Sequence, residues 1–182
     1  MAPIRSQYSL GLDIGTTKVA AAIVDATSRE VIATQSLAHE SDVPGLVTGR
    51  SEQVVSKIIS SLDECVHRLP VEARRMISSI GVTGQMHGVV LWNAETKEVS
   101  NLVTWQDQRC LEGDFLARLR EVSGDASAQS GYGTSTLAWL AAREPKVLHR
   151  YSCASTIHDY VAALLGGNER PFTDPSDAAS FG

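Results

Sequence analysis

The sequence is poor in cysteine, and this scarcity argues against a protein held together by disulfides or structural zinc. Its three cysteines, Cys65, Cys110 and Cys153, are odd in number and far apart in the chain. No CxxC or HExxH spacing is present to bind zinc. We therefore expect three reduced thiols, mostly buried, in a cytoplasmic protein.

Positive charge and long apolar runs are also lacking. The formal net charge is −5, whereas nucleic acid and anionic membranes attract proteins with a concentrated basic face. No apolar run approaches the roughly eighteen residues of a membrane span, and residues 1–7 lack the apolar core of a signal peptide. We therefore expect neither a nucleic-acid partner nor a membrane partner. A hydrophobic content of 43% is ordinary for a globular protein.

Three short segments rich in valine, isoleucine, leucine and alanine open the chain. They cover residues 8–14, 19–25 and 30–37, and are separated by Gly15-Thr16-Thr17 and by residues 26–29. Short apolar runs joined by tight turns are typical of consecutive strands. The pattern predicts a three-stranded antiparallel β-meander.

A helix and a further strand follow the meander. Apolar residues recur with the 3.6-residue period of an amphipathic helix over residues 51–69. Ser51 can cap this helix, Glu52 suits its first turn, and Pro70 follows its end. Residues 77–83 then have the composition of a buried strand. A strand, a helix and another strand after a meander predict an α/β layer.

The second half of the chain alternates shorter elements. The expected strands cover residues 89–92 and 102–105, and the expected helices cover residues 107–122, 134–142 and 157–165. No segment resembles an interdomain linker, an internal repeat or a low-complexity region.

The turn after the first expected strand could bind phosphate. Gly15 has no Cβ, so backbone N–H groups can approach phosphate oxygens, and the hydroxyls of Thr16 and Thr17 add donors. Asp13 precedes the turn and could hold Mg²⁺ through water, since this ion prefers carboxylate oxygen and keeps much of its hydration. Taken alone, the same motif could be a hairpin turn in which Asp13 only satisfies local backbone donors.

Six motifs occur in an order that resembles the FGGY family of carbohydrate kinases, and together they span nearly the whole chain. They are D-x-G-T-T at 13–17, S-E-Q at 51–53, G-Q-M-H-G at 84–88, T-W-Q-D-Q-R at 104–109, H-D-Y at 158–160 and T-D-P-S-D-A-A-S at 173–180. Within the family, the motifs look most similar to those of ketose kinases for sedoheptulose, with kinases for xylulose next.

The resemblance implies an α/β fold of the ribonuclease-H-like, actin-like ATPase type, with a mixed sheet and flanking helices. In that family ATP and sugar meet between two such domains, and residues 1–182 would be the N-terminal one. The implied cofactors are ATP and Mg²⁺, and the implied substrate is a small sugar. The residues matched to the phosphate turn are Gly15, Thr16 and Thr17, and we expect Lys18 to bind phosphate beside them. Those assigned to the sugar are Met86, His87, Trp105 and Asp107, and Asp13 is the supporting acid and metal ligand.

The residue types at the expected sugar site suit a polyol. A neutral imidazole both donates and accepts hydrogen bonds, and an indole offers a flat wall to the C–H face of a sugar. His87 follows a predicted buried strand, near the strand end where α/β sheets tend to bind ligands. Met86 could equally be a core residue. The other histidines without a motif, His39, His67 and His149, are expected at the surface.

One basic residue departs from the family pattern. Related kinases often carry lysine or arginine where this chain has Ala20, and here Lys18 lies two residues earlier. Residues two apart on a strand face the same side, so we expect Lys18 to replace the missing cation.

A second departure concerns length. The family's catalytic aspartate lies in a Gly-Gly-Asp-like segment further along the chain, and nothing in these 182 residues matches it. We therefore expect the N-terminal part of a ketose kinase, with little phosphotransfer activity of its own. A non-catalytic protein that binds sugar or nucleotide, and another actin-like ATPase, are the alternatives. The sequence leaves the ketose and the oligomeric state open.

Overall fold

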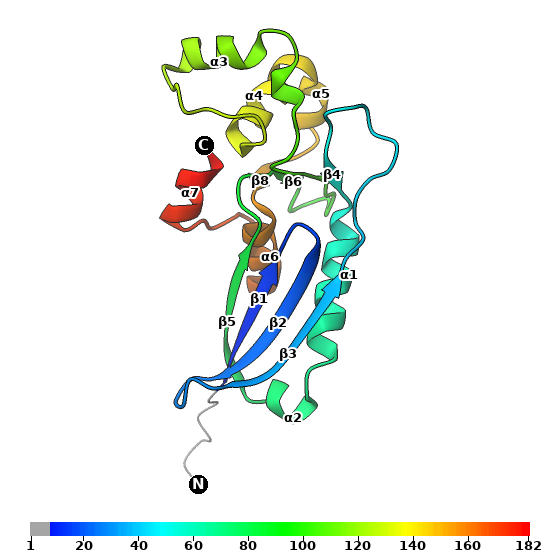
Figure 1. Ribbon diagram of the computed structural model, residues 1–182, viewed down its shortest axis with the longest axis vertical. Coiled ribbons are helices and arrows are strands. Elements are labelled where there is room, and N and C mark those ends of the chain that lie inside the picture. The colour runs from blue at the N-terminus through cyan, green and yellow to red at the C-terminus, as the bar shows by residue number, and fades with distance from the viewer. Residues whose placement is uncertain (1–7) are drawn as a thin grey trace. The chain divides into compact units, whose positions relative to one another are not determined.

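A computed structural model describes residues 8–182, which form two compact units (Figure 1). The first unit contains the described residues up to Glu40 together with Ser56–Gly84, and the second contains Ser41–Val55 and Gln85–Gly182. The chain therefore crosses between the units three times. The single domain expected over residues 1–182 stays a prediction, and within it neither unit is continuous in sequence.

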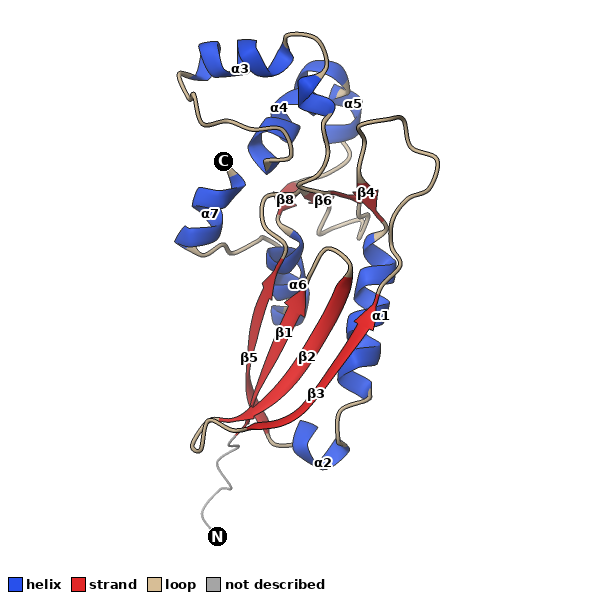
Figure 2. Cartoon of the chain, in the orientation of Figure 1, coloured by secondary structure: helices blue, strands red, loops and turns tan. Residues whose placement is uncertain are grey.

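The first unit is built on a four-stranded mixed sheet (Figure 2). Its strands are β1 (Tyr8–Ile14), β2 (Lys18–Asp25), β3 (Val31–Ala38) and β5 (Ile77–Gly84), in the order β3-β2-β1-β5. The pairs β1–β2 and β2–β3 are antiparallel, and β5 is parallel to β1. The predicted meander is confirmed, and β5 joins it after a helical crossover, as an α/β layer requires.

One face of this sheet is apolar and is covered by helix α1 (Val55–His67). Alternate residues of β1 and β2 are buried on that face: Leu10, Leu12, Ile14, Val19, Ala21 and Ile23. The helix buries Ile58, Leu62 and Cys65, which are spaced along one stripe, and the Cys65 Sγ atom lies 3.8 Å from the Val19 carbonyl oxygen. Burying a leucine or isoleucine side chain stabilises a fold by about 1.5–3 kcal/mol. A short helix, α2 (Val71–Arg74), leads on to β5.

The first helix begins later than the sequence predicts. Residues 51–54 were expected in its first turn with Ser51 as the cap, but Glu52–Gln53 form strand β4 and pair with β7 (Leu102–Val103). The Ser51 N–H donates to the Asp107 carboxylate at 2.8 Å, and the Ser51 carbonyl accepts from Thr104 N–H at 3.0 Å. These hydrogen bonds to distant residues hold residues 51–53 in an extended conformation, so the helix begins only at Val55.

The second unit combines short strand pairs with helices. Besides the β4–β7 pair, β6 (Val90–Trp92) pairs with β8 (Cys153–Ser155). The sequence predicts a strand at β6 but none at β8. The helical elements are η1 (Arg109–Leu111), α3 (Phe115–Ser123), α4 (Gly133–Arg143), α5 (Pro145–Leu148), α6 (Ile157–Gly166) and α7 (Pro175–Phe181).

The helix expected over residues 107–122 is two separate elements. The segment begins with a turn around the buried Asp107, and Gly113 has a φ of +61°, which breaks the helical path before α3 begins at Phe115. A left-handed residue cannot continue a right-handed helix. The prediction of one continuous helix is therefore wrong.

The core of the second unit lies between its strands and helices. It contains Val89, Leu91, Val103, Cys110, Leu116, Ala128, Trp139 and Leu140. Cys65 and Cys110 are buried and Cys153 is half-buried, and all three are free thiols, as the sequence predicts. Burial raises the pKa of the Cys110 thiol to about 11, which keeps it protonated at neutral pH.

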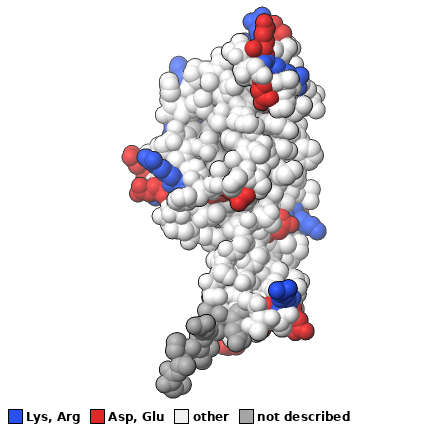
Figure 3. Space-filling model, turned by 90° about the vertical axis from the view of Figure 1, so that its left-hand side faces the viewer, with Lys and Arg blue, Asp and Glu red and all other residues white. Residues whose placement is uncertain are grey.

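The surface carries charges of both signs. On the face drawn in Figure 3, acidic and basic side chains lie in small groups separated by uncharged surface. Within residues 8–182, no helix combines the length and the apolar character needed to cross a membrane.

Candidate functional site

The turn between β1 and β2 is closed by its own backbone. The Gly15 N–H donates to the Lys18 carbonyl at 2.9 Å. A Cβ atom at Gly15 would lie 3.0 Å from that same carbonyl oxygen, so a side chain there would press on the hydrogen bond that closes the turn. This close approach explains the glycine that the sequence places before Thr16 and Thr17.

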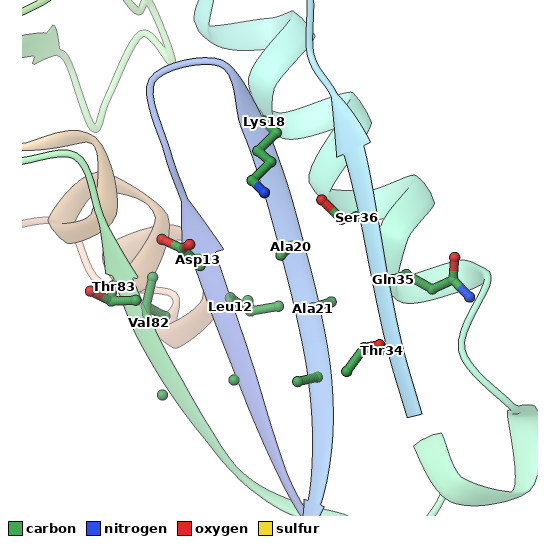
Figure 4. A pocket seen from close by; sticks show the side chains of 13 residues that line it. Leu12, Asp13, Lys18, Ala20, Ala21, Thr34, Gln35, Ser36, Val82 and Thr83 are labelled. Atoms are coloured by element: carbon green, nitrogen blue, oxygen red, sulfur yellow. The ribbon is translucent and has the colours of Figure 1, made fainter. Parts of the chain in front are cut away.

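A row of aligned residues crosses the open face of the sheet below this turn (Figure 4). Asp13 pairs with Thr83 on one side and with Ala20 on the other, and Ala20 pairs with Ser36. Lys18 lies two residues along β2 from Ala20, and both line the same hollow of about 740 Å³. The prediction that they share a face is confirmed; the proposed replacement of a cation at position 20 by Lys18 remains a prediction.

Asp13 fits the magnesium role that the sequence suggests. Its side chain is exposed and lines the hollow, on the strand next to that of Lys18. A single exposed carboxylate offers hard oxygen ligands and leaves room for the water molecules that Mg²⁺ retains. Asp13 could thus hold such an ion, with Lys18 lining the same hollow.

The residues expected to contact sugar lie in the second unit, and His87 is held there by two contacts. Its Nδ1 lies within hydrogen-bond distance of the Ser180 carbonyl. Because a carbonyl only accepts, Nδ1 carries the proton and Nε2 is the acceptor of the neutral ring. The ring stacks on Tyr132 with centroids 4.4 Å apart and planes inclined by 13°.

The backbone at His87 is unusual for a residue with a side chain. Its φ is +71°, in the left-handed region. The next residue must be glycine, since a Cβ atom at Gly88 would lie 2.6 Å from the Val103 carbonyl oxygen. Strained backbone of this kind costs on the order of 1–3 kcal/mol and is often found at functional sites.

Tyr132 is a residue of this site that the sequence interpretation missed. The preceding Gly131 has a φ of +87°, and a Cβ atom there would lie 2.0 Å from the Trp105 carbonyl oxygen. The Gly131-Tyr132 segment therefore connects the Trp105 backbone to the His87 ring. Trp105 and Met86 are 45% and 56% exposed, which leaves both accessible to a ligand. The available signal was a tyrosine between two glycines, a pattern that marks close backbone approach.

The Asp107 carboxylate is fully engaged by donors of the protein itself. Its side chain is fully buried. One carboxylate oxygen accepts from the Arg109 N–H and Nε, at 2.9 and 2.8 Å, and the other accepts from the Ser51 N–H at 2.8 Å and from Arg109 at 3.1 Å. The expected direct sugar contact by Asp107 disagrees with this geometry, because every lone-pair direction already serves a protein donor.

Glu52 belongs to the same network and was wrongly interpreted as a first-turn helix acid. Its carboxylate accepts from the Arg109 guanidinium at 2.8 Å and from the Asn101 amide at 3.1 Å. Burial opposes the charge of Arg109, but hydrogen bonds and charges from Asp107 and Glu52 raise the pKa of Arg109. The buried guanidinium therefore stays charged and ties the segment after Trp105 to β4.

His39 is also not where the sequence predicts it. It is only 5% exposed, and its Nε2 lies 3.2 Å from the Gly15 carbonyl oxygen. His67 and His149 are exposed, as expected.

One histidine and two aspartates of α6 and α7 form a cluster. Ligand atoms of His158, Asp159 and Asp177 lie within 4.8 Å of one another. The Asp177 carboxylate accepts from the Thr156 hydroxyl at 3.0 Å and lies 3.1 Å from His158 Nε2. Burial, and the nearby negative charge of Asp177, raise the pKa of Asp159. These contacts within the protein account for the cluster without an ion.

The model of the FGGY family of carbohydrate kinases, N-terminal domain, matches residues 8–182. The chain belongs to the FGGY family of carbohydrate kinases. As an FGGY chain it has the α/β actin-like fold of that N-terminal domain, with the β3-β2-β1-β5 sheet at its start.

Known FGGY relatives are much longer than this chain. It is 38% identical to the sedoheptulokinase of Mus musculus and 40% identical to that of Homo sapiens, in each case over 96% of this chain and 41% of the relative. A solved xylulose kinase from Lactobacillus acidophilus matches 96% of this chain and 36% of its own, with a TM-score of 0.79 and 21% identity. The chain thus spans about two fifths of the sedoheptulokinases that it resembles.

Proposed function

We propose that these residues serve a ketose kinase that transfers the γ-phosphoryl group of ATP to sedoheptulose, giving sedoheptulose 7-phosphate. The observation that carries this proposal is the 40% identity to the human sedoheptulokinase, against 31% to a xylulose kinase of Lactococcus lactis. Xylulose is the second candidate on the same ground. Because the relatives are more than twice as long, the activity belongs to an enzyme of that length.

The first unit supplies the phosphate side of the reaction. Backbone N–H groups and hydroxyls of Thr16 and Thr17 bind phosphate oxygens in the turn that the Gly15–Lys18 hydrogen bond closes, and the Lys18 ammonium group adds a positive charge. Asp13, which lines the same hollow, would hold Mg²⁺ through water. Phosphoryl transfer depends mostly on such positioning and charge neutralisation.

The second unit supplies the sugar side. With its Nδ1 proton directed to Ser180, His87 presents Nε2 as an acceptor for a sugar hydroxyl. Trp105 provides an exposed flat surface for C–H groups, and Met86 adds apolar contact. Asp107 and Arg109 hold the segment that carries Trp105 rather than touching sugar.

Tryptophan fluorescence offers a direct test of this assignment. Of the three tryptophans, Trp92 and Trp139 are buried and only Trp105 is exposed. Millimolar sedoheptulose is expected to protect Trp105 from acrylamide quenching more strongly than xylulose or ribulose does. His87→Ala should abolish the protection, whereas the surface control His149→Ala should retain it.

Two results would contradict the proposal. If no ketose reduces the quenching, the proposed sugar site is wrong. If xylulose protects Trp105 more strongly than sedoheptulose does, xylulose becomes the first candidate substrate.

In a coupled assay of ADP release, the 182-residue chain should show little turnover with sedoheptulose. Robust turnover would show that these residues suffice for catalysis.

Lys18→Ala is expected to weaken binding of ADP by about 10- to 100-fold, because a charge-assisted hydrogen bond contributes about 1.5–3 kcal/mol. Calorimetric titration measures this loss. The double variant Lys18→Ala/Ala20→Lys should recover affinity, since both positions line the same hollow. Lys146→Ala on the exposed surface of α5 is the control. Unchanged affinity in Lys18→Ala would refute the role of Lys18.

A further inference from the structure

His39 touches the phosphate turn at two points. Its Nε2 lies 3.2 Å from the Gly15 carbonyl oxygen, and its backbone N–H donates to the Thr17 carbonyl at 3.4 Å. A carbonyl can only accept, so the imidazole carries a proton on Nε2 and donates it to Gly15. His39 is only 5% exposed, so this donor is withdrawn from solvent.

The hydrogen bond to Gly15 also fixes the next amide. In a planar trans peptide the C=O of one residue and the N–H of the next point in opposite directions. Holding the Gly15 carbonyl toward His39 therefore directs the Thr16 N–H away from His39. Thr16 N–H belongs to the backbone of the turn that the proposed function assigns to phosphate.

The corner that carries His39 is itself held in place. Glu40 has a φ of +44°, a left-handed conformation that residues with side chains rarely adopt. The Lys57 ammonium group of α1 donates to the Glu40 carbonyl at 3.0 Å. A contact from α1 thus pins the end of β3, and this fixed corner presents the imidazole to Gly15.

We propose that His39 is a positioning residue for the phosphate turn, orienting the Thr16 amide through the Gly15 carbonyl without touching the nucleotide. The inference rests on the proposed function, because it assigns His39 to the turn that would bind phosphate. The amino-acid sequence alone does not indicate this positioning role, since His39 lies outside all six family motifs.

Two substitutions of similar length separate the hydrogen bond from the packing. His39→Gln keeps an N–H donor near the position of Nε2, whereas His39→Met fills similar space without a donor. Calorimetric titration with ADP should show about a tenfold loss of affinity for His39→Met and less than a twofold loss for His39→Gln. A purely structural role would lower thermal stability in both variants without this split in affinity.

Amide NMR of the ligand-free chain provides a second measurement. The Thr16 ¹H–¹⁵N resonance should move in His39→Met and stay near its wild-type position in His39→Gln. Equal ADP affinities in the two variants, or an unmoved Thr16 resonance in His39→Met, would overturn the inference. If wild-type chain binds no ADP, the proposed phosphate site fails, while the Thr16 resonance still decides whether His39 orients the turn.

Discussion

Gly131→Ala is expected to destabilise the chain by about 3 kcal/mol, which is among the largest effects of a single methyl group here. The new Cβ would lie 2.0 Å from the Trp105 carbonyl oxygen and 2.7 Å from its carbon, both rigid backbone atoms. The φ of +87° adds a penalty for any residue with a side chain. Urea denaturation followed by tryptophan fluorescence measures the loss.

Gly124→Ala is the matched control for this substitution. Gly124 also has a positive φ, +72°, but nothing lies within 4 Å of a Cβ placed there. We expect a loss of about 1 kcal/mol, which represents the backbone conformation alone. Equal losses in the two variants would show that the contact between Gly131 and Trp105 is not tight. If Gly131→Ala loses more stability than Gly124→Ala, we also expect sugar to protect Trp105 from acrylamide quenching less in Gly131→Ala than in the wild-type chain.

Asp107→Ala is expected to cost about 3–5 kcal/mol of stability, because it leaves the buried Arg109 charge with one carboxylate partner fewer. Arg109 is 5% exposed and the Asp107 side chain is fully buried, so solvent cannot replace the lost contacts. Asp114→Ala removes an exposed pair with Arg118 and should cost less than about 1 kcal/mol. Urea denaturation compares the two variants.

Two further variants distinguish a structural role for Asp107 from the sugar contact that its motif suggested. If Asp107 supports the fold, the double variant Asp107→Ala/Arg109→Met should recover part of the lost stability, since it removes the buried charge that has lost one of its two carboxylate partners. If Asp107 binds sugar, Asp107→Asn should lose ketose affinity while its denaturation midpoint stays unchanged. That second result would contradict the role inferred from its burial.

The sheet of the first unit could be predicted from sequence because its pattern is local. Alternating burial along β1 and β2 follows from apolar residues two apart, and Gly15 marks the turn. The helical stripe of Ile58, Leu62 and Cys65 is equally local. Such patterns are set by neighbours in the chain, which a single sequence contains.

The errors lie where distant segments decide the structure. Glu52 has helical neighbours in sequence, but a strand near residue 102 and the Arg109 guanidinium hold it in an extended segment. His39 looks like a surface histidine until the Gly15 carbonyl is placed beside it. The burial of Asp107 depends on Ser51, 56 residues away. No local period carries that information.

The chain enters the second unit and returns between β3 and β5, and the resulting separation of β1 from β5 has a consequence for synthesis. β1 pairs with β2 almost as soon as both leave the ribosome, but its other edge must wait for β5, which begins at Ile77. At about 5–20 residues per second this leaves the edge of β1 unpaired for several seconds. An open strand edge is a template for wrong pairing. The nascent chain is therefore most exposed to misassembly, and most in need of a chaperone, while residues 41–76 are being made.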